Sequence, residues 1–178
     1  LEPIETFVDQ VQRAVDEFLQ SKAQQLKDDE QGTLTYQLKG FDQRIQFRAC
    51  EQIPEVEFVQ EQWLKHKSHL KVSCPLENKS LLIGVELTLK RPVYVLNQAV
   101  ERLERVADSV TLETRNILKL NQGYYEETET MKTLVAKRSL AAGTTLNPRH
   151  LKKEVLVARN SQVSIQAHIS GIAVTTQG

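Results

Sequence analysis

The sequence predicts an α+β protein: an N-terminal helix and an antiparallel meander, followed by two related β units and the start of a further β domain. Three observations predict this class. Apolar residues recur at helical spacing over residues 3–26, alternate with polar residues along short segments of 34–89, and recur about forty positions apart over 91–157. A chain of 178 residues is long enough for one or two small domains.

The predicted helix extends from Pro3 to Leu26. Glu2 and Glu5 carry negative charge near its first turn, where the helix dipole favours it. The polar face mixes Asp, Gln and Lys, so the helix is expected to pack on a core and not to lie along a membrane surface. Its apolar positions are Ile4, Phe7, Val8, Val11, Val15, Phe18, Leu19 and Leu26.

The meander is predicted from alternating apolar and polar residues, which indicate half-buried strands. The turns between them contain Gly, Pro or Asp, as in residues 28–32 and 75–79. Together with the helix, these strands define an N-terminal α+β domain over residues 1–90. The alternating segments are 34–38, 45–49, 56–58, 70–72 and 81–89.

A basic segment with two histidines lies in this meander, over residues 65–71. His66 and His69 could hold a metal only if both faced one way, but a strand places residues three apart on opposite faces. We therefore interpret the segment as a charged, solvated strand edge. A basic contact patch for a partner is the alternative.

The internal repeat begins after Pro92. Gly143 allows the chain to reverse, and Asn147 followed by Pro148 is typical of a helix start, so the second copy predicts strand, Gly turn, short helix and strand. The first copy lacks the glycine. We place this repeat in a second domain, 91–157, and assign 158–178 to the start of a third, with a hairpin over 163–174. The related pairs are Val95 with Val135, Val100 with Leu140 and Val106 with Leu146.

Candidate binding residues lie between and within the two copies. Tyr124 and Tyr125 precede an acidic run and could anchor a partner, although one of them could instead pack in the core. Lys137 and Arg138 open the second copy. We expect a binding surface between the second and third domains to use these four residues, with a hinge at residues 155–162.

Composition excludes several classes of function. Lys and Arg total 23, as do Asp and Glu, so no net field favours nucleic acid or an anionic membrane. No apolar run approaches the roughly 20 residues that span a bilayer. There is no P-loop, nucleophile-elbow motif or metal-ligand cluster. We therefore expect no enzyme activity, no cofactor and no membrane insertion.

The two cysteines, Cys50 and Cys74, end two predicted strands. They could be buried and reduced, or form a disulfide if the compartment is oxidising. We predict that they are bonded on neighbouring strands, with Cα atoms about 4.4–6.8 Å apart.

The order of residues in the second copy resembles the SAF domain, a small β-clip module. The resemblance rests on a basic residue followed by spaced leucines and a glycine. These positions are filled by Arg138, Leu140, Gly143, Leu146 and Leu151.

Over residues 44–178 the chain resembles one SAF-containing family, the flagellar basal-body P-ring formation proteins. The resemblance includes the cysteines Cys50 and Cys74, the Pro92-Val93-x-Val95 start, Tyr124-Tyr125 and Gly171-Ile172-x-Val174. It departs from the family where the first copy lacks glycine. It also implies further C-terminal strands, so 158–178 is expected to be a truncated domain.

The resemblance implies a periplasmic chaperone, mature after removal of a signal peptide, that binds the flagellar P-ring subunit and assists P-ring assembly around the rod. We expect a monomer or weak dimer. A SAF-domain component of pilus or envelope assembly is the alternative. A sialic acid synthase is disfavoured, because these 178 residues are too few to contain the barrel of that enzyme.

Overall fold

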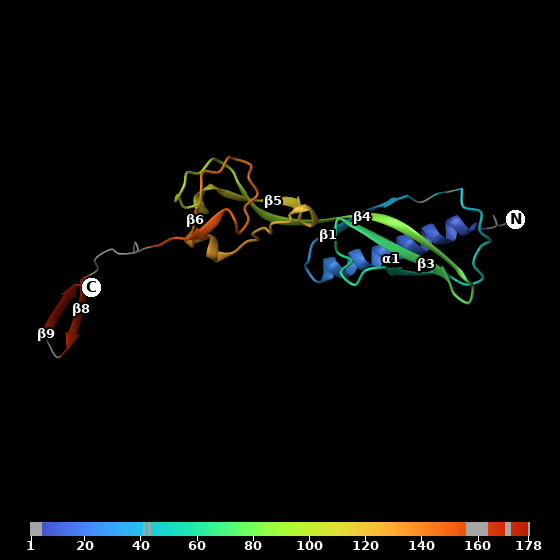
Figure 1. Cartoon of the computed structure of the whole chain (residues 1–178), viewed down its shortest axis with the longest axis horizontal. Helices are drawn as coiled ribbons and strands as arrows, with labels where there is room; N and C mark the ends of the chain where they lie inside the picture. Colours follow the sequence, from blue (N-terminus) through green and yellow to red (C-terminus); the bar gives the residue numbers. More distant parts are fainter. Residues whose placement is uncertain (1–4, 41, 43, 156–163, 170–171, 178) are drawn as a thin grey trace.

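The computed structural model of the chain describes residues 5–40, 42, 44–155, 164–169 and 172–177. A helix lies along a five-stranded antiparallel sheet, and one long strand leads from this sheet into the second half of the molecule (Figure 1). The strand order is β1-β4-β3-β2, with β5 paired to the far half of β4. The predicted class of one helix followed by antiparallel strands is confirmed. These elements are α1 (Phe7–Asp28), β1 (Thr33–Lys39), β2 (Glu55–Phe58), β3 (Lys67–Cys74), β4 (Lys79–Leu96) and β5 (Val110–Asn116).

Helix α1 confirms the predicted helix but begins at Phe7, because Thr6 and Asp9 form a capping box. The Asp9 N–H donates to Thr6 Oγ1 (3.2 Å), and the Thr6 N–H donates to Asp9 Oδ2 (3.0 Å). This exchange satisfies two backbone groups that a helix start leaves without partners. The hydrogen bonds from Thr6 also hold the pKa of Asp9 below its ordinary value.

The first core lies between α1 and one face of the sheet. Val11, Val15 and Leu19 of α1 are fully buried, as the helical spacing predicts, and they share a cluster with Leu70 of β3 and Leu87 of β4. Burying each such side chain contributes about 1.5–3 kcal/mol. The same strands expose their alternate residues, which explains the strict alternation along β3.

The strand predicted at residues 45–49 is wrong, because this segment pairs with no strand. The side chain of Gln10 on α1 serves the backbone instead: its Oε1 accepts from the Cys50 N–H (2.7 Å), and its Nε2 donates to the Cys50 carbonyl (3.2 Å). The predicted disulfide between Cys50 and Cys74 is present, with Cα atoms 5.4 Å apart. It joins β3 to an irregular loop, so the expectation of neighbouring strands is wrong.

Strand β4 passes residue 90 without a break. Its first part pairs with β1 and β3, and the segment Lys90–Leu96 pairs with β5. Ile117 and Leu118, which follow β5, pack against the first core. The side chain of Asn116 accepts hydrogen bonds from the N–H groups of both Leu89 and Leu118, at 3.2 Å each. Residues beyond position 90 therefore complete the N-terminal core.

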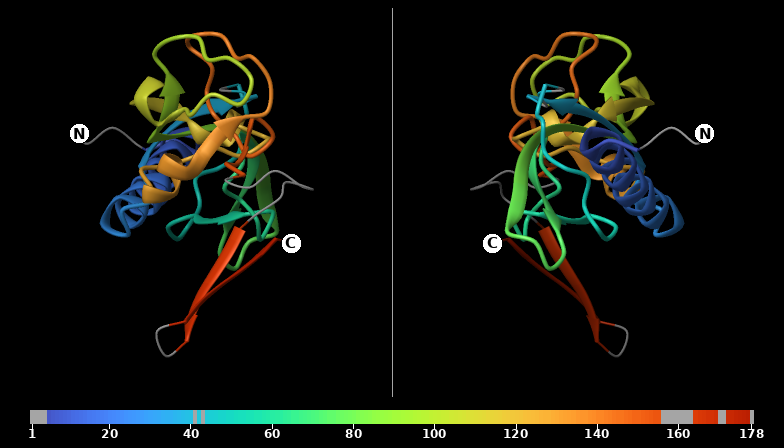
Figure 2. Two further views of the ribbon diagram at one scale, coloured as in Figure 1. Left: turned by 90° about the vertical axis from the view of Figure 1, so that its left-hand side faces the viewer. Right: turned by 90° about the vertical axis from the view of Figure 1, so that its right-hand side faces the viewer.

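A second core lies in the region that we call the two-arm unit, residues 91–155. Figure 2 shows the backbone of this unit in views along the long axis of the molecule. It contains the short strands β6 (Leu134–Ala136) and β7 (Leu151–Lys153), which pair with each other. The short helix predicted after Pro148 is wrong. The Lys137 N–H donates to the His150 carbonyl (2.8 Å), so the chain turns at 148–150 and returns directly as a strand. The buried residues of this core are Leu96, Val100, Val106, Met131, Leu134, Ala136, Leu140, Leu146 and Leu151.

The last described elements are β8 (Ser164–Ile169) and β9 (Ile172–Gln177), which form an antiparallel hairpin. The predicted hairpin is confirmed, although Val163, Ser170 and Gly171 lie outside the described residues. Within the part of the chain that the structure describes, these two strands pair only with each other. The expected hinge at 155–162 also lies almost wholly outside the described residues.

Candidate partner-binding surface

The two-arm unit consists of a first arm, residues 93–113, and a second arm, residues 133–154, which pair around a central bridge. The Val100 N–H donates to the Leu140 carbonyl (3.0 Å), and the Leu140 N–H donates to the Val100 carbonyl (2.9 Å). Residues forty positions apart thus face each other at the centre. The predicted internal repeat is confirmed.

The hydrogen bonds on either side of this bridge come in equivalent pairs. The Leu146 N–H donates to the Tyr94 carbonyl (3.0 Å), and the Val106 N–H donates to the Leu134 carbonyl (3.3 Å). The two bonds are equivalent: Val106 lies forty positions before Leu146, and Leu134 lies forty positions after Tyr94. The arms are therefore related by an approximate twofold axis, although their side chains differ.

The equivalence continues past the turn with one extra residue in the second arm. The Asn97 N–H donates to the Ser109 carbonyl (2.9 Å), as the Lys137 N–H donates to that of His150 (2.8 Å). Equivalent residues are therefore forty positions apart up to Val106 and forty-one apart from residue 108. This relation identifies which side chain of one arm replaces which side chain of the other.

Tyr124 and Tyr125 lie in the connection between the arms, and both are half-buried. The Tyr125 carbonyl accepts from the Tyr94 N–H (2.8 Å), and the Tyr125 side chain packs against the second core. The adjacent Glu126 forms an ion pair with Arg91 on β4 (2.9 Å). The alternative in which one tyrosine packs in the core therefore fits Tyr125.

Lys137 and Arg138 are exposed at the start of the second arm. The Nζ of Lys137 donates to the Pro148 carbonyl (3.3 Å). In the described residues, no hydrogen bond or ion pair joins either of these cations to Tyr124 or Tyr125. The four candidate residues belong to the same two-arm unit, but they are not brought into one contacting group.

The structure instead places His150 near Arg138, a contact that the sequence did not predict. Burial, and after it the charge of Arg138, lowers the pKa of His150 below the ordinary value of 6.5. The His150 Nδ1 atom is buried and has no hydrogen-bond partner. Protonation would place an unpaired N–H there, so the geometry also favours the neutral ring.

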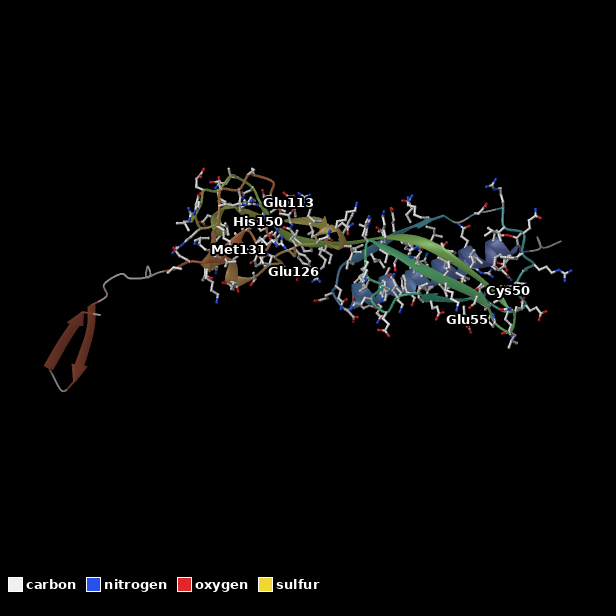
Figure 3. The ribbon with its side chains drawn as sticks, in the orientation of Figure 1. Cys50, Glu55, Glu113, Glu126, Met131 and His150 are labelled. Carbon is white, nitrogen blue, oxygen red and sulfur yellow. A yellow bond between two sulfur atoms is a disulfide. The ribbon has the colours of Figure 1, made fainter. Side chains whose placement is uncertain are left out.

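A surface cavity of about 880 Å³ lies beside the first arm, and Met131, which is labelled in Figure 3, is one of the residues that line it. Arg105 and Lys132 line it, and both are already neutralised. Arg105 donates to Glu154 Oε2 at 2.9 and 2.7 Å, and Lys132 pairs with Glu129, so each pairing raises the pKa of the basic group. These two cations are therefore already engaged by acidic side chains of the protein. Its polar and apolar lining includes Tyr94, Asp108, Glu127 and Met131.

The described residues offer neither a metal-binding cluster nor a membrane-spanning helix. They contain no group of three or more His, Cys, Asp or Glu side chains able to hold a metal ion. The imidazole ring of His66 instead forms a hydrogen bond with the backbone, with its Nδ1 atom 3.1 Å from the Leu87 carbonyl oxygen. No described helix is both long enough and apolar enough to cross a membrane.

Comparison with known protein families gives a match over the second half of the chain. Residues 91–178 match the family described as "Chaperone for flagella basal body P-ring formation". No curated protein matches the chain.

Two solved structures share the fold. FlgA from Salmonella, in an open form, matches with a TM-score of 0.60 and 17% identity, over 93% of this chain and 76% of that one. Flagellar protein FlgA from Thermotoga maritima MSB8 matches with a TM-score of 0.56 and 15% identity, over 96% and 69%. At these identities the likeness concerns the fold. It extends over the N-terminal sheet as well as the two-arm unit.

Proposed function

Residues 91–178 of this chain belong to the family of chaperones for flagella basal body P-ring formation, and from this premise we propose that the protein binds the P-ring subunit in the periplasm and assists its assembly around the rod. The family match carries the proposal, because it covers both arms and the β8–β9 hairpin. The Cys50–Cys74 disulfide supports an oxidising compartment, since such bonds persist mainly outside the cytosol.

We further propose that the domains are 1–90, 91–157 and 158–178, that the two-arm unit is a SAF-like β-clip, and that the protein is a monomer or weak dimer without enzyme activity. Separate buried clusters in the first two parts support the division between them. The continuous strand β4 and the packing of Ile117 and Leu118 indicate that these two parts support each other's folding.

The proposed subunit-binding surface lies on the two-arm unit, on the side of the C-terminal β segment, and not on α1. The apolar side chains of α1 are already used, since Val11, Val15 and Leu19 are fully buried under its own sheet. The outer face keeps exposed polar residues such as Gln12 and Glu17, which provide little anchoring energy. The connection and the second arm instead offer Tyr124, Tyr125 and Arg138, of the residue types most often found as binding hot spots, together with Lys137.

The test replaces Tyr124 or Arg138 with Ala and measures swimming motility and binding of purified P-ring subunit. Within the described residues neither Tyr124 nor Arg138 belongs to a core cluster, so circular dichroism should show an unchanged fold. We expect reduced motility and weaker subunit binding from both variants. Gln12→Ala and Glu17→Ala on the outer face of α1 are the matched controls.

The opposite pattern would contradict the proposed surface: full activity in both two-arm variants and loss in the α1 variants. A deletion strain that swims normally and assembles P-rings would instead contradict the proposed function. Loss of pili from that strain would then favour the SAF-domain component of pilus or envelope assembly.

A further inference from the structure

The approximate twofold axis of the two-arm unit allows equivalent residues of the two arms to be compared, and the arms differ in charge. The second arm carries five cations: Lys137, Arg138, Arg149, Lys152 and Lys153. Their equivalents in the first arm are uncharged or acidic: Asn97, Gln98, Asp108, Thr111 and Leu112. Because the first arm adopts the same backbone arrangement without these cations, the fold does not require them.

The five cations lack acidic partners. All five side chains belong to exposed residues, and none forms an ion pair within the part of the chain that the structure describes. Some other basic residues of the unit do have such partners, since Arg91 pairs with Glu126 and Arg105 with Glu154, whereas Arg102 and Lys119 have none in the described structure. The second arm contains only one acid, Glu154, and that acid is held by Arg105. In a chain whose charges balance overall, this is a local excess of positive charge.

The same arm presents an open strand edge. Strand β7 pairs with β6 on one side, where Lys152 faces Val135 and the Glu154 N–H donates to Thr133 (2.9 Å). Alternate residues of an antiparallel strand direct their backbone groups to opposite sides. Leu151 and Lys153 therefore direct their N–H and C=O groups to the other side, where no described strand pairs with β7.

From these two features we infer that the β7 edge of the second arm binds an extended acidic segment of a partner protein by strand addition. The open N–H and C=O groups supply the main-chain hydrogen bonds of such a complex. The five cations supply charge complementarity, which raises the rate of association and selects against basic segments. A lipid surface would use the charge but not the edge. The inference rests on the proposed function in taking the P-ring subunit as the partner.

The first experiment compares two charge-matched variants in binding to purified P-ring subunit. One variant neutralises four second-arm cations (Arg138→Gln, Arg149→Gln, Lys152→Gln and Lys153→Gln), and Lys137 is retained because it contacts Pro148. The control variant neutralises four exposed cations elsewhere that also lack ion pairs in the described structure: Lys65, Lys67, Arg102 and Lys119, each to Gln.

We expect the second-arm variant to bind about tenfold more weakly at low salt and to lose most of its salt dependence, because surface charges act mainly through screened attraction. The control variant should bind like the wild type. Equal weakening in both variants, or in neither, overturns the inference and leaves the proposed function intact. Failure of the wild-type protein to bind the subunit counts against the proposed function, and the inference is then decided by the second experiment.

The second experiment uses a fluorescent peptide of four Glu-Val repeats, measured by anisotropy. We expect it to bind the wild type and the control variant, and to bind the second-arm variant at least about tenfold more weakly. A peptide with the same charges but N-methylated at every residue has no N–H to donate to the ladder from either edge, so it should bind as weakly as a Lys-Val peptide.

Three further results would also overturn the inference. The first is equal binding of the N-methylated peptide, which would show that the edge is not used. The second is tighter binding of the wild type to phosphatidylglycerol vesicles than to the Glu-Val peptide, with the same loss in the second-arm variant. The third is self-association of the chain that the second-arm variant abolishes, seen by sedimentation, which would assign the surface to a second copy.

Discussion

Leu103 takes the same left-handed backbone conformation in the first arm that Gly143 takes at the equivalent position of the second, with φ of +70° and +82°. Both residues donate their N–H to the opposite arm, Leu103 to the Ala136 carbonyl (2.8 Å) and Gly143 to the Leu96 carbonyl (2.7 Å). The absence of glycine from the first arm therefore leaves the turn unchanged. It imposes on Leu103 a conformation that costs a residue with a Cβ about 1–2 kcal/mol.

Substitutions at these two positions should have opposite effects on the stability of the protein. Leu103→Gly should raise the free energy of unfolding by about 0.5–1 kcal/mol, because it relieves the strain while removing a side chain that is 55% exposed. Gly143→Ala should lower it by about 1 kcal/mol, since a Cβ there meets no atom within 4 Å and only the backbone conformation opposes it. Urea denaturation measures both. A loss of stability in Leu103→Gly would show that the Leu103 side chain contributes more than its exposure indicates.

Two buried serines should respond differently to the loss of their hydroxyl groups. The hydroxyl of Ser68, on β3, has no hydrogen-bond partner in the part of the chain that the structure describes, whereas the hydroxyl of Ser109 accepts from Gln98 Nε2 (2.8 Å). Ser68→Ala should raise the free energy of unfolding by about 1 kcal/mol, because it removes an unsatisfied polar group from the core. Ser109→Ala should lower it by about 1 kcal/mol. Thermal and urea unfolding of the two variants test the contrast, and equal effects would refute it.

The disulfide should be a main support of the N-terminal sheet. Replacing Cys50 and Cys74 with Ala opens a loop with a sequence separation of 24 residues. The free energy of unfolding should then fall by about 3 kcal/mol. The same fall should follow addition of dithiothreitol to the wild type, while the double variant should be indifferent to the reductant. A double variant that unfolds at the wild-type urea concentration would contradict this expectation.

The stability of the second arm should depend on pH through His150. The pKa of this residue is lowered in the folded state, chiefly by burial, so on acidification the unfolded chain binds the proton first. The stability contributed by the neutral ring is complete above about pH 6.5 and declines as the pH falls from there towards the lowered folded pKa. His150→Asn should therefore lose less stability between pH 7 and pH 5 than the wild type, as measured by urea denaturation at both values.

Arg138 should contribute to this lowered pKa by charge repulsion. Arg138→Gln should raise the pKa of His150, measured by NMR titration of the imidazole protons. Lys119→Gln, which removes a cation from another exposed position, should leave the titration unchanged. An unchanged pKa in Arg138→Gln would mean that burial alone sets the titration of the ring.

Local patterns in the sequence determined the helix, most strands and the internal repeat. The spacing of Val11, Val15 and Leu19 predicts a buried helix face because 3.6 residues complete a turn. The match of Val100 with Leu140 predicts two related arms, and the central bridge joins these two residues. Such patterns can be recognised in a sequence because a helix or strand that buries one face repeats its apolar residues at a fixed spacing.

Tertiary structure alone decided the features that depend on distant partners. Residues 45–49 alternate like a strand, yet the backbone of Cys50 is satisfied by Gln10, forty positions away, and no pattern within the segment reports that bond. Likewise Lys152 and Lys153 look like ordinary surface cations in the sequence. Only the register of β7 shows that they flank an open edge, because hydrogen-bond partners depend on where strands meet in space.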